Sequence, residues 1–218
     1  MAQPIIILGV GGNSIDLLDI LHHINKAGKK TKFNCMGFLD DSFPFPHNQL
    51  QGLPILGPLA KALDYPSCLF INGIGSIHST LHKEAILQRT GVGLDRFAII
   101  CHPSAVVSPS ATIGPGSVIF PMVTLCSNSK IGQHVLVLPQ SVLSHDSVVG
   151  DYSSLASGVC LSGNVKVGRQ CYLGSRCVIR EHVQIGDRAL IGMGSVVLQN
   201  VENDMTVYGN PAKVGKGG

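Results

Sequence analysis

The hydrophobic pattern of the chain is dominated by a six-residue period between positions 107 and 197. Every sixth residue in this range, here called a ladder residue, is Ile, Leu or Val, through sixteen consecutive hits without an insertion or deletion. Six is a multiple of the two-residue period of a strand and fits the helical period of 3.6 badly. A short fixed period with one obligatory aliphatic residue is typical of a solenoid. The pattern therefore predicts about five coils of a triangular parallel β-helix, with three hexads in each coil.

Two further regularities accompany the ladder. The residue four places after each ladder residue is small or Val, as in Ser117 and Val159, and we expect it on the inside of a corner. Gly often follows the ladder residue directly, as in Gly132 and Gly168. We expect these glycines to serve turns that need a positive φ angle.

The first hundred residues show a different pattern, in which strands alternate with helices. The expected strands are 4–8, 34–39, 68–72 and 97–100, and the expected helices are 15–28 and 79–90. The first strand, a glycine turn and the first helix form a unit that meets phosphate oxygens with N–H groups at the helix N-terminus. The glycine fingerprint is imperfect, because Ser14 stands where G-x-G-x-x-G has its last glycine. We expect an α/β, Rossmann-like nucleotide-sugar-binding domain over 1–100 and a β-helix over 101–218 with a short C-terminal tail.

Composition narrows the function classes. Only 13% of the residues are charged, Gly is abundant at 26 residues and Trp is absent, which suits a β-solenoid with glycine at its corners. A net charge of +3 without a basic stripe argues against nucleic-acid binding. No stretch is long enough for a membrane span and none has the pattern of a signal peptide. The seven cysteines form no Cys-x-x-Cys pair, so we expect reduced core thiols in a cytoplasmic protein.

Among the nine histidines, His145 differs because Asp146 follows it within a polar run of the ladder. A histidine beside a carboxylate can act as a general base, but an exposed corner histidine without a function has the same spacing. His134 and His182 precede corner residues, where we expect them to point to solvent. A zinc site with three histidines is disfavoured, because only His134 and His145 lie near the middle of the ladder.

Several longer motifs are distributed along nearly the whole chain. They are Gly9-Val10-Gly11-Gly12-Asn13, Phe38-Leu39-Asp40-Asp41, Gly73-Ile74-Gly75, His102-Pro103-Ser104-Ala105, His145-Asp146, Gly163-Asn164-Val165-Lys166-Val167-Gly168 and Gly209-Asn210-Pro211-Ala212-Lys213. In this order they resemble the hexapeptide-repeat acyltransferases, and more narrowly the NeuD/PglD-like sugar acyltransferases. The resemblance implies a left-handed parallel β-helix and a homotrimer with active sites between subunits, where acetyl-CoA binds between neighbouring prisms.

The resemblance also implies an activity and a set of site residues. The expected enzyme is an acetyl-CoA-dependent N-acetyltransferase that needs no metal. It would act on the amino group of a nucleotide-linked amino sugar, of the 4-amino-4,6-dideoxyhexose type, for surface glycans such as lipopolysaccharide. The resemblance makes His145 the general base, lets Asp146 raise its basicity and makes the Gly163 N–H a donor near the thioester carbonyl. The residues expected to contact acetyl-CoA are Ser154, Gly163, Ser175 and Met193, and those expected to hold the nucleotide sugar are Gly11, Gly12, Asn13, Asp40, Asp41 and Gly75.

The chain departs from the family pattern at Asn13 and Ser154, where relatives often have histidine. Three other functions stay open: O-acetylation of a sugar such as sialic acid, a non-catalytic β-helix that binds sugar nucleotides, and a metal enzyme like the γ-carbonic anhydrases. For Asp40 and Asp41, the end of a strand suits hydrogen bonds to ribose or base groups, and a turn or helix cap explains the same spacing. The base of the nucleotide, the sugar and the length of the acyl group are open.

Overall fold

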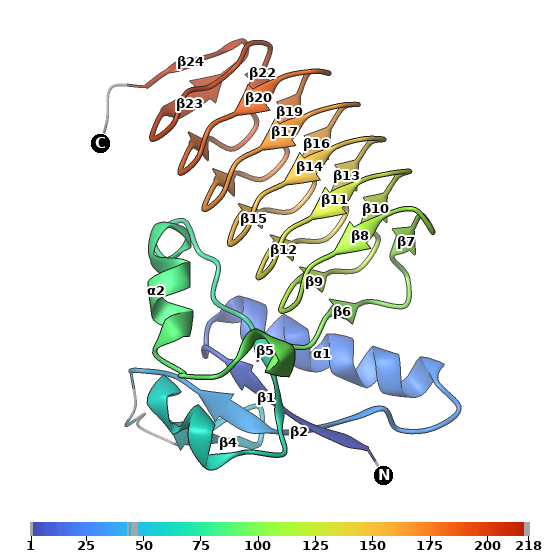
Figure 1. Ribbon diagram of the computed structural model, residues 1–218, viewed down its shortest axis with the longest axis vertical. Coiled ribbons are helices and arrows are strands. Elements are labelled where there is room, and N and C mark those ends of the chain that lie inside the picture. The colour runs from blue at the N-terminus through green and yellow to red at the C-terminus, as the bar shows by residue number, and fades with distance from the viewer. Residues whose placement is uncertain (1, 43, 45–47, 216–218) are drawn as a thin grey trace.

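The computed structural model describes residues 2–42, 44 and 48–215 (Figure 1). Its first part contains a five-stranded sheet in the order β3-β4-β2-β1-β5. Its elements are β1 Gln3–Leu8, α1 Gly12–Ala27, β2 Phe33–Leu39, β3 Gln49–Leu50, β4 Leu53–Gly57, the 3-10 helix Leu59–Asp64, β5 Leu69–Asn72, the 3-10 helix Thr80–His82, α2 Lys83–Gln88 and the 3-10 helix Leu94–Arg96. β1 pairs in parallel with β2 and β5, so the expected α/β fold of this part is confirmed.

Two expected elements of the first part are shorter than predicted. The α-helix expected over 79–90 is restricted to α2, which ends where the Thr90 hydroxyl donates to the Leu87 carbonyl and Gly91 takes a φ of 64°. In the strand expected over 97–100, Phe97 makes only an isolated bridge. The strand that follows, β6 Ile100–Cys101, pairs with β9 and so belongs to the β-helix. The β3–β4 hairpin escaped prediction.

The ladder region forms the predicted left-handed parallel β-helix, a triangular prism of two-residue strands. The strands are β7 Val106–Val107, β8 Thr112–Ile113, β9 Val118–Ile119, β10 Thr124–Leu125, β11 Lys130–Ile131, β12 Leu136–Val137, β13 Val142–Leu143, β14 Val148–Val149, β15 Ser154–Leu155, β16 Cys160–Leu161, β17 Lys166–Val167, β18 Tyr172–Leu173, β19 Val178–Ile179, β20 Gln184–Ile185, β21 Leu190–Ile191 and β22 Val196–Val197. Each ladder residue is the second residue of its strand, and from Ile119 onward every one is buried. The aliphatic ladder is therefore the core of the prism.

The prism has three faces, each of them one sheet whose strands are parallel, apart from the antiparallel last strand β24. We call them the β7 face (β7, β10, β13, β16, β19, β22), the β8 face (β8, β11, β14, β17, β20) and the β6 face (β6, β9, β12, β15, β18, β21, β23, β24). The tail after the ladder adds β23 Thr206–Gly209 and β24 Ala212–Val214 to the β6 face, and the end of the expected tail, 216–218, lies outside the described residues. α1 lies between the first sheet and the first coils of the prism (Figure 1).

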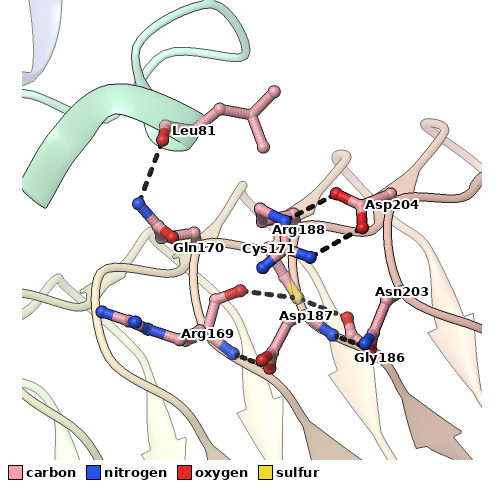
Figure 2. A network of polar contacts seen from close by, with 9 residues as sticks. All are labelled: Leu81, Arg169, Gln170, Cys171, Gly186, Asp187, Arg188, Asn203 and Asp204. Atoms are coloured by element: carbon pink, nitrogen blue, oxygen red, sulfur yellow. Dashed lines mark hydrogen bonds and ion pairs between the residues drawn. The ribbon is translucent and has the colours of Figure 1, made fainter.

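The glycines after the ladder residues do not have the positive φ angles that we expected. Positive φ angles occur instead three places after the ladder residue, for example at Asp146 and Asn164. The glycines allow neighbouring coils to approach closely: a Cβ atom at Gly168 would lie 2.7 Å from the Asp187 nitrogen. The Asp187 carboxylate accepts the Arg169 N–H at 2.9 Å, and Figure 2 shows this bond between coils. Glycine here serves the stacking of coils rather than a turn.

The corner residues and the cysteines agree with the predicted packing. The corner serines are buried, and four of them donate to the next coil, as the Ser153 hydroxyl does to the Gly168 carbonyl at 2.8 Å. All seven cysteines are free thiols, and burial raises the pKa of Cys171 to about 11 and that of Cys177 to about 12. Within the described residues, no helix has the length and apolar character needed to cross a membrane.

Candidate functional site

A cavity of about 470 Å³ lies at the carboxyl ends of the parallel strands β1, β2 and β5. Its lining residues are Gly9, Val10, Gly11, Gly12, Asn13, Asp16, Asp40, Gly73, Ile74, Gly75, Ser76, Ser79, Leu138 and Tyr172. α1 begins here at Gly12, and no side chain caps its first N–H groups. An uncapped helix N-terminus at the edge of a parallel sheet favours an anion such as a phosphate. The structure thus brings together five of the six residues expected to hold the nucleotide sugar.

The two adjacent aspartates that follow β2 have different surroundings. Asp40 lines the cavity, and its carboxylate accepts the Val10 N–H at 3.1 Å and both donors of Ser42. Asp41 is absent from this lining: its carboxylate accepts the Leu59 N–H at 2.9 Å and pairs with Arg89 at 2.8 Å. Asp40 is therefore placed to meet a ligand, whereas Asp41 is engaged in holding a neighbouring helix and a surface arginine.

His145 and Asp146 lie at the corner that joins the β7 face to the β8 face. Asp146 has a φ of 59°, and its carboxylate accepts the His145 Nδ1–H at 2.9 Å. The Asn128 amide, one coil earlier, donates to the other carboxylate oxygen at 3.0 Å. The hydrogen bond from His145, followed by that from Asn128, lowers the pKa of Asp146. A carboxylate on Nδ1 leaves the lone pair of Nε2 free, which is the arrangement that a general base needs.

Gly163 lies one coil after His145 and touches its ring. A Cβ atom at Gly163 would lie 2.7 Å from both Cε1 and Nε2 of His145. In the part of the chain that the structure describes, the Gly163 N–H has no acceptor. An N–H donor and a basic nitrogen thus lie side by side on an exposed corner, since the His145 side chain is 61% exposed.

The other expected acetyl-CoA residues lie elsewhere. Ser175 and Met193 are exposed at the corner between the β6 and β7 faces, Met193 to 80%. Ser154 is buried on the β6 face beneath the first domain, where its hydroxyl accepts from Lys83 at 2.7 Å. One chain therefore does not bring these residues to His145.

The cavity and His145 lie on different sides of one chain. Leu138 and Tyr172 place the cavity against the β6 face, and the corner of His145 joins the two other faces. In a triangular prism, such a corner is opposite the third face. The cavity and the candidate base of one chain are therefore separated by the width of the prism.

Sequence reasoning missed several residues of these sites. Asn128 could have been found by counting one coil back from Asp146, whereas Tyr172 carries no local signal. His134 was expected to face solvent and is buried instead: its ring packs against Phe97 and stacks on Tyr152, with centroids 4.5 and 5.4 Å away. Burial lowers the pKa of His134 to about 4.

With this geometry in place, comparison with known proteins identifies the family. A family model described as the GMPPB C-terminal domain matches residues 101–210, half of the chain. The chain belongs to this family. Structural similarity to known proteins extends beyond residues 101–210, because solved structures also align with the first domain.

Two solved structures cover almost the whole chain. The acetyltransferase domain of PglB from Neisseria gonorrhoeae FA1090, in complex with acetyl coenzyme A, has 23% identity and a TM-score of 0.82, covering 98% of this chain and 100% of that chain. PerB from Caulobacter crescentus, in complex with CoA and GDP-perosamine, has 24% identity and a TM-score of 0.83, covering 98% and 97%. These structures confirm the predicted fold, which is the fold expected from the resemblance to the NeuD/PglD-like sugar acyltransferases.

A curated relative matches a shorter segment. The UDP-N-acetylbacillosamine N-acetyltransferase of Bacillus subtilis (strain 168) is 43% identical over 54 residues, which are 25% of this chain and 24% of that protein. The match therefore spans about a quarter of the relative's length.

Proposed function

We propose that the protein is an acetyl-CoA-dependent N-acetyltransferase that acts on a nucleotide-linked amino sugar of the 4-amino-4,6-dideoxyhexose type. The observation that carries the proposal is the free Nε2 of His145, oriented by Asp146 and flanked by the Gly163 N–H. The cavity at the N-terminus of α1 supplies a place for the nucleotide. The relatives solved with acetyl coenzyme A, and with CoA and GDP-perosamine, support the two substrate classes.

The chemistry follows from the placement of these groups. Nε2 of His145 accepts a proton from the sugar amine as its nitrogen bonds to the thioester carbon. The Gly163 N–H donates to the oxygen that becomes an oxyanion. The carbon–sulfur bond then breaks, and the proton on His145 passes to the sulfur of CoA. Asp146 stabilises the imidazolium between these steps, and no metal or covalent enzyme intermediate is needed.

We propose further that residues 1–100 form the nucleotide-sugar domain, that 101–218 form the acyltransferase domain, and that the active enzyme is a homotrimer. The outward residues of the β7 face form a mainly apolar stripe in register: Val106, Thr124, Val142, Cys160, Val178 and Val196. The first domain covers part of the β6 face, around Leu138, Ser154 and Tyr172. The β8 face carries Lys130 and Lys166. A second copy on the β7 face would cover the stripe and bring the bordering His145 to the cavity of a neighbouring chain.

We place the reaction in the cytoplasm, in the synthesis of surface glycans. The seven free thiols support a reducing compartment. Asn13 lines the cavity directly and is the residue through which nucleotide or sugar preference is expected to differ from that of relatives with histidine.

The proposal is tested by release of CoA from acetyl-CoA across a panel of acceptors. The panel contains 4-amino-4,6-dideoxyhexoses linked to UDP, dTDP and GDP, with free sialic acid as the control acceptor. We expect turnover with at least one nucleotide-linked amine and an N-acetyl product by mass spectrometry. Turnover with sialic acid alone would replace the proposal by O-acetylation. The absence of turnover with every acceptor of the panel would contradict the proposal.

A further inference from the structure

Lys83 is a buried lysine at the contact between the first domain and the prism. It is the first residue of α2 and is completely buried. Its Nζ donates to the Ser154 hydroxyl at 2.7 Å and to the carbonyls of Ser153 and His134 at 3.3 and 3.4 Å. No carboxylate among the described residues pairs with it. Burial lowers its pKa to about 7. Burying a lysine without an acid is costly, so a specific role is required to explain it.

The Ser154 hydroxyl, which accepts the hydrogen bond from Lys83, also contacts the wall of the cavity. The Thr80 hydroxyl donates to the Ser76 carbonyl at 2.8 Å and shares a hydrogen bond with the Ser154 hydroxyl at 3.1 Å. Gly75 lies directly against this hydroxyl, because a Cβ atom at Gly75 would be 2.9 Å from it. Gly75 and Ser76 both line the cavity. Ser154 is thus the point where the buried lysine and the cavity loop meet.

We propose that Lys83 is a positioning residue for the nucleotide-sugar cavity, acting through Ser154 and Thr80 to fix the Gly75–Ser76 wall against the β6 face. The proposal rests on the proposed function of the cavity. It also gives Ser154 a role in nucleotide-sugar binding in place of the expected contact with acetyl-CoA.

The contacts at the rim of the same interface provide the control. Arg169 of the prism pairs with Glu84, the neighbour of Lys83 on α2, at 2.7 Å, and both side chains are partly exposed. Gln170 donates to the Leu81 carbonyl at 3.0 Å, as Figure 2 shows. These contacts hold α2 and the 3-10 helix before it on the prism without touching Ser154. A variant at Arg169 therefore perturbs the docking of α2 while leaving the route to the cavity wall intact.

The experiment compares Lys83→Met, Ser154→Ala and Arg169→Gln in the full chain. Isothermal titration with UDP, dTDP, GDP and acetyl-CoA gives the Kd of each. We expect Lys83→Met and Ser154→Ala each to raise the Kd of the bound nucleotide about tenfold, the effect of leaving one buried hydrogen-bond partner unmet. The Kd of acetyl-CoA stays within about twofold, and Arg169→Gln changes neither. In turnover, the KM of the nucleotide sugar rises while kcat stays within about threefold.

The combined variant tests whether Lys83 and Ser154 act on the cavity wall through the same chain of contacts. If they do, Lys83→Met together with Ser154→Ala weakens nucleotide binding no more than either change alone. If Lys83→Met fails to fold, as judged by circular dichroism, Ser154→Ala decides the matter.

Each other result has a distinct meaning. Unchanged nucleotide binding by Ser154→Ala overturns the inference and leaves the proposed function standing. A raised Kd for acetyl-CoA in that variant supports the cofactor role of Ser154 instead and also overturns it. If Arg169→Gln weakened nucleotide binding as much as Lys83→Met, Lys83 would only help to dock α2 on the prism, and the inference would be overturned. A wild-type protein that binds none of the three nucleotides would overturn the inference and the proposed function together.

Discussion

Replacing Gly163 by Ala tests the catalytic corner by moving one ring. The new Cβ atom would lie 2.7 Å from Cε1 and Nε2 of His145, about 0.7 Å inside the onset of ordinary van der Waals contact at 3.4 Å. The His145 side chain is 61% exposed, so the imidazole can swing outward while the main chain stays in place. The substitution therefore displaces the proposed base without requiring the coil to deform.

The magnitude follows from this displacement. A ring moved by about 0.7 Å loses its alignment with Asp146 or with the amine, and a misplacement of about 1 Å can cost 100-fold. We expect kcat to fall roughly 10- to 100-fold, with the KM of both substrates changed less than about threefold. The melting temperature should stay within about 2 °C, because no buried contact is lost.

Gly168→Ala is the matched control on the same prism. Its Cβ atom would lie 2.7 Å from the Asp187 nitrogen and 2.9 Å from the Asp187 Cα, and this main chain cannot swing away. Overpacking of this kind costs about 2 kcal/mol, which lowers the melting temperature by roughly 4–8 °C. CoA release and thermal unfolding by circular dichroism are measured on both variants. If Gly163→Ala keeps full kcat, or loses as much stability as Gly168→Ala, the reasoning is refuted.

Three shorter predictions accompany this one. His145→Asn should lower kcat by about 10² to 10⁴ with KM nearly unchanged, and Asp146→Asn should lower kcat less. A rise in KM as large as the fall in kcat would contradict the role of His145 as the base. Val178→Glu puts a charge on the β7 face and should give inactive monomers by light scattering; an active trimer would refute that interface. The lowered pKa of Lys83 means that the unfolded chain binds more protons between pH 7 and 9, so stability rises with pH there by up to about 1.4 kcal/mol per unit. Lys83→Met should flatten this rise in urea unfolding, and an unchanged slope would contradict the shift.

The prism was predictable because its period is a direct record of strand geometry. A spacing of six, held through every corner, leaves one side of each strand facing a common core. The period does not show which residue of the hexad makes the turn. Glycine was therefore assigned to the turn, whereas Asp146 and Asn164 adopt the positive φ angles and Gly168 accommodates the next coil.

Residues at the contact between the two domains were the least predictable. His134 occupies the same place in its hexad as His182, which is exposed, but Phe97 and Tyr152 cover His134. Lys83 would ordinarily be a solvated lysine at the start of a short helix. Neither difference is written in the local sequence, because the covering groups come from segments tens of residues away.

The coil of the prism provides a rule for finding such partners. Asn128 and Asp146 are 18 residues apart and share a hydrogen bond, and Gly163 follows His145 at the same interval and touches its ring. Functional neighbours in the prism are therefore found by adding or subtracting one coil, not by reading adjacent residues. Residues one coil apart always lie at the same corner, so the rule never relates residues of two different corners. It thus extends the site around His145 along its own corner but not to the cavity on the β6 face, and this separation is the physical reason for proposing that a second chain completes the site.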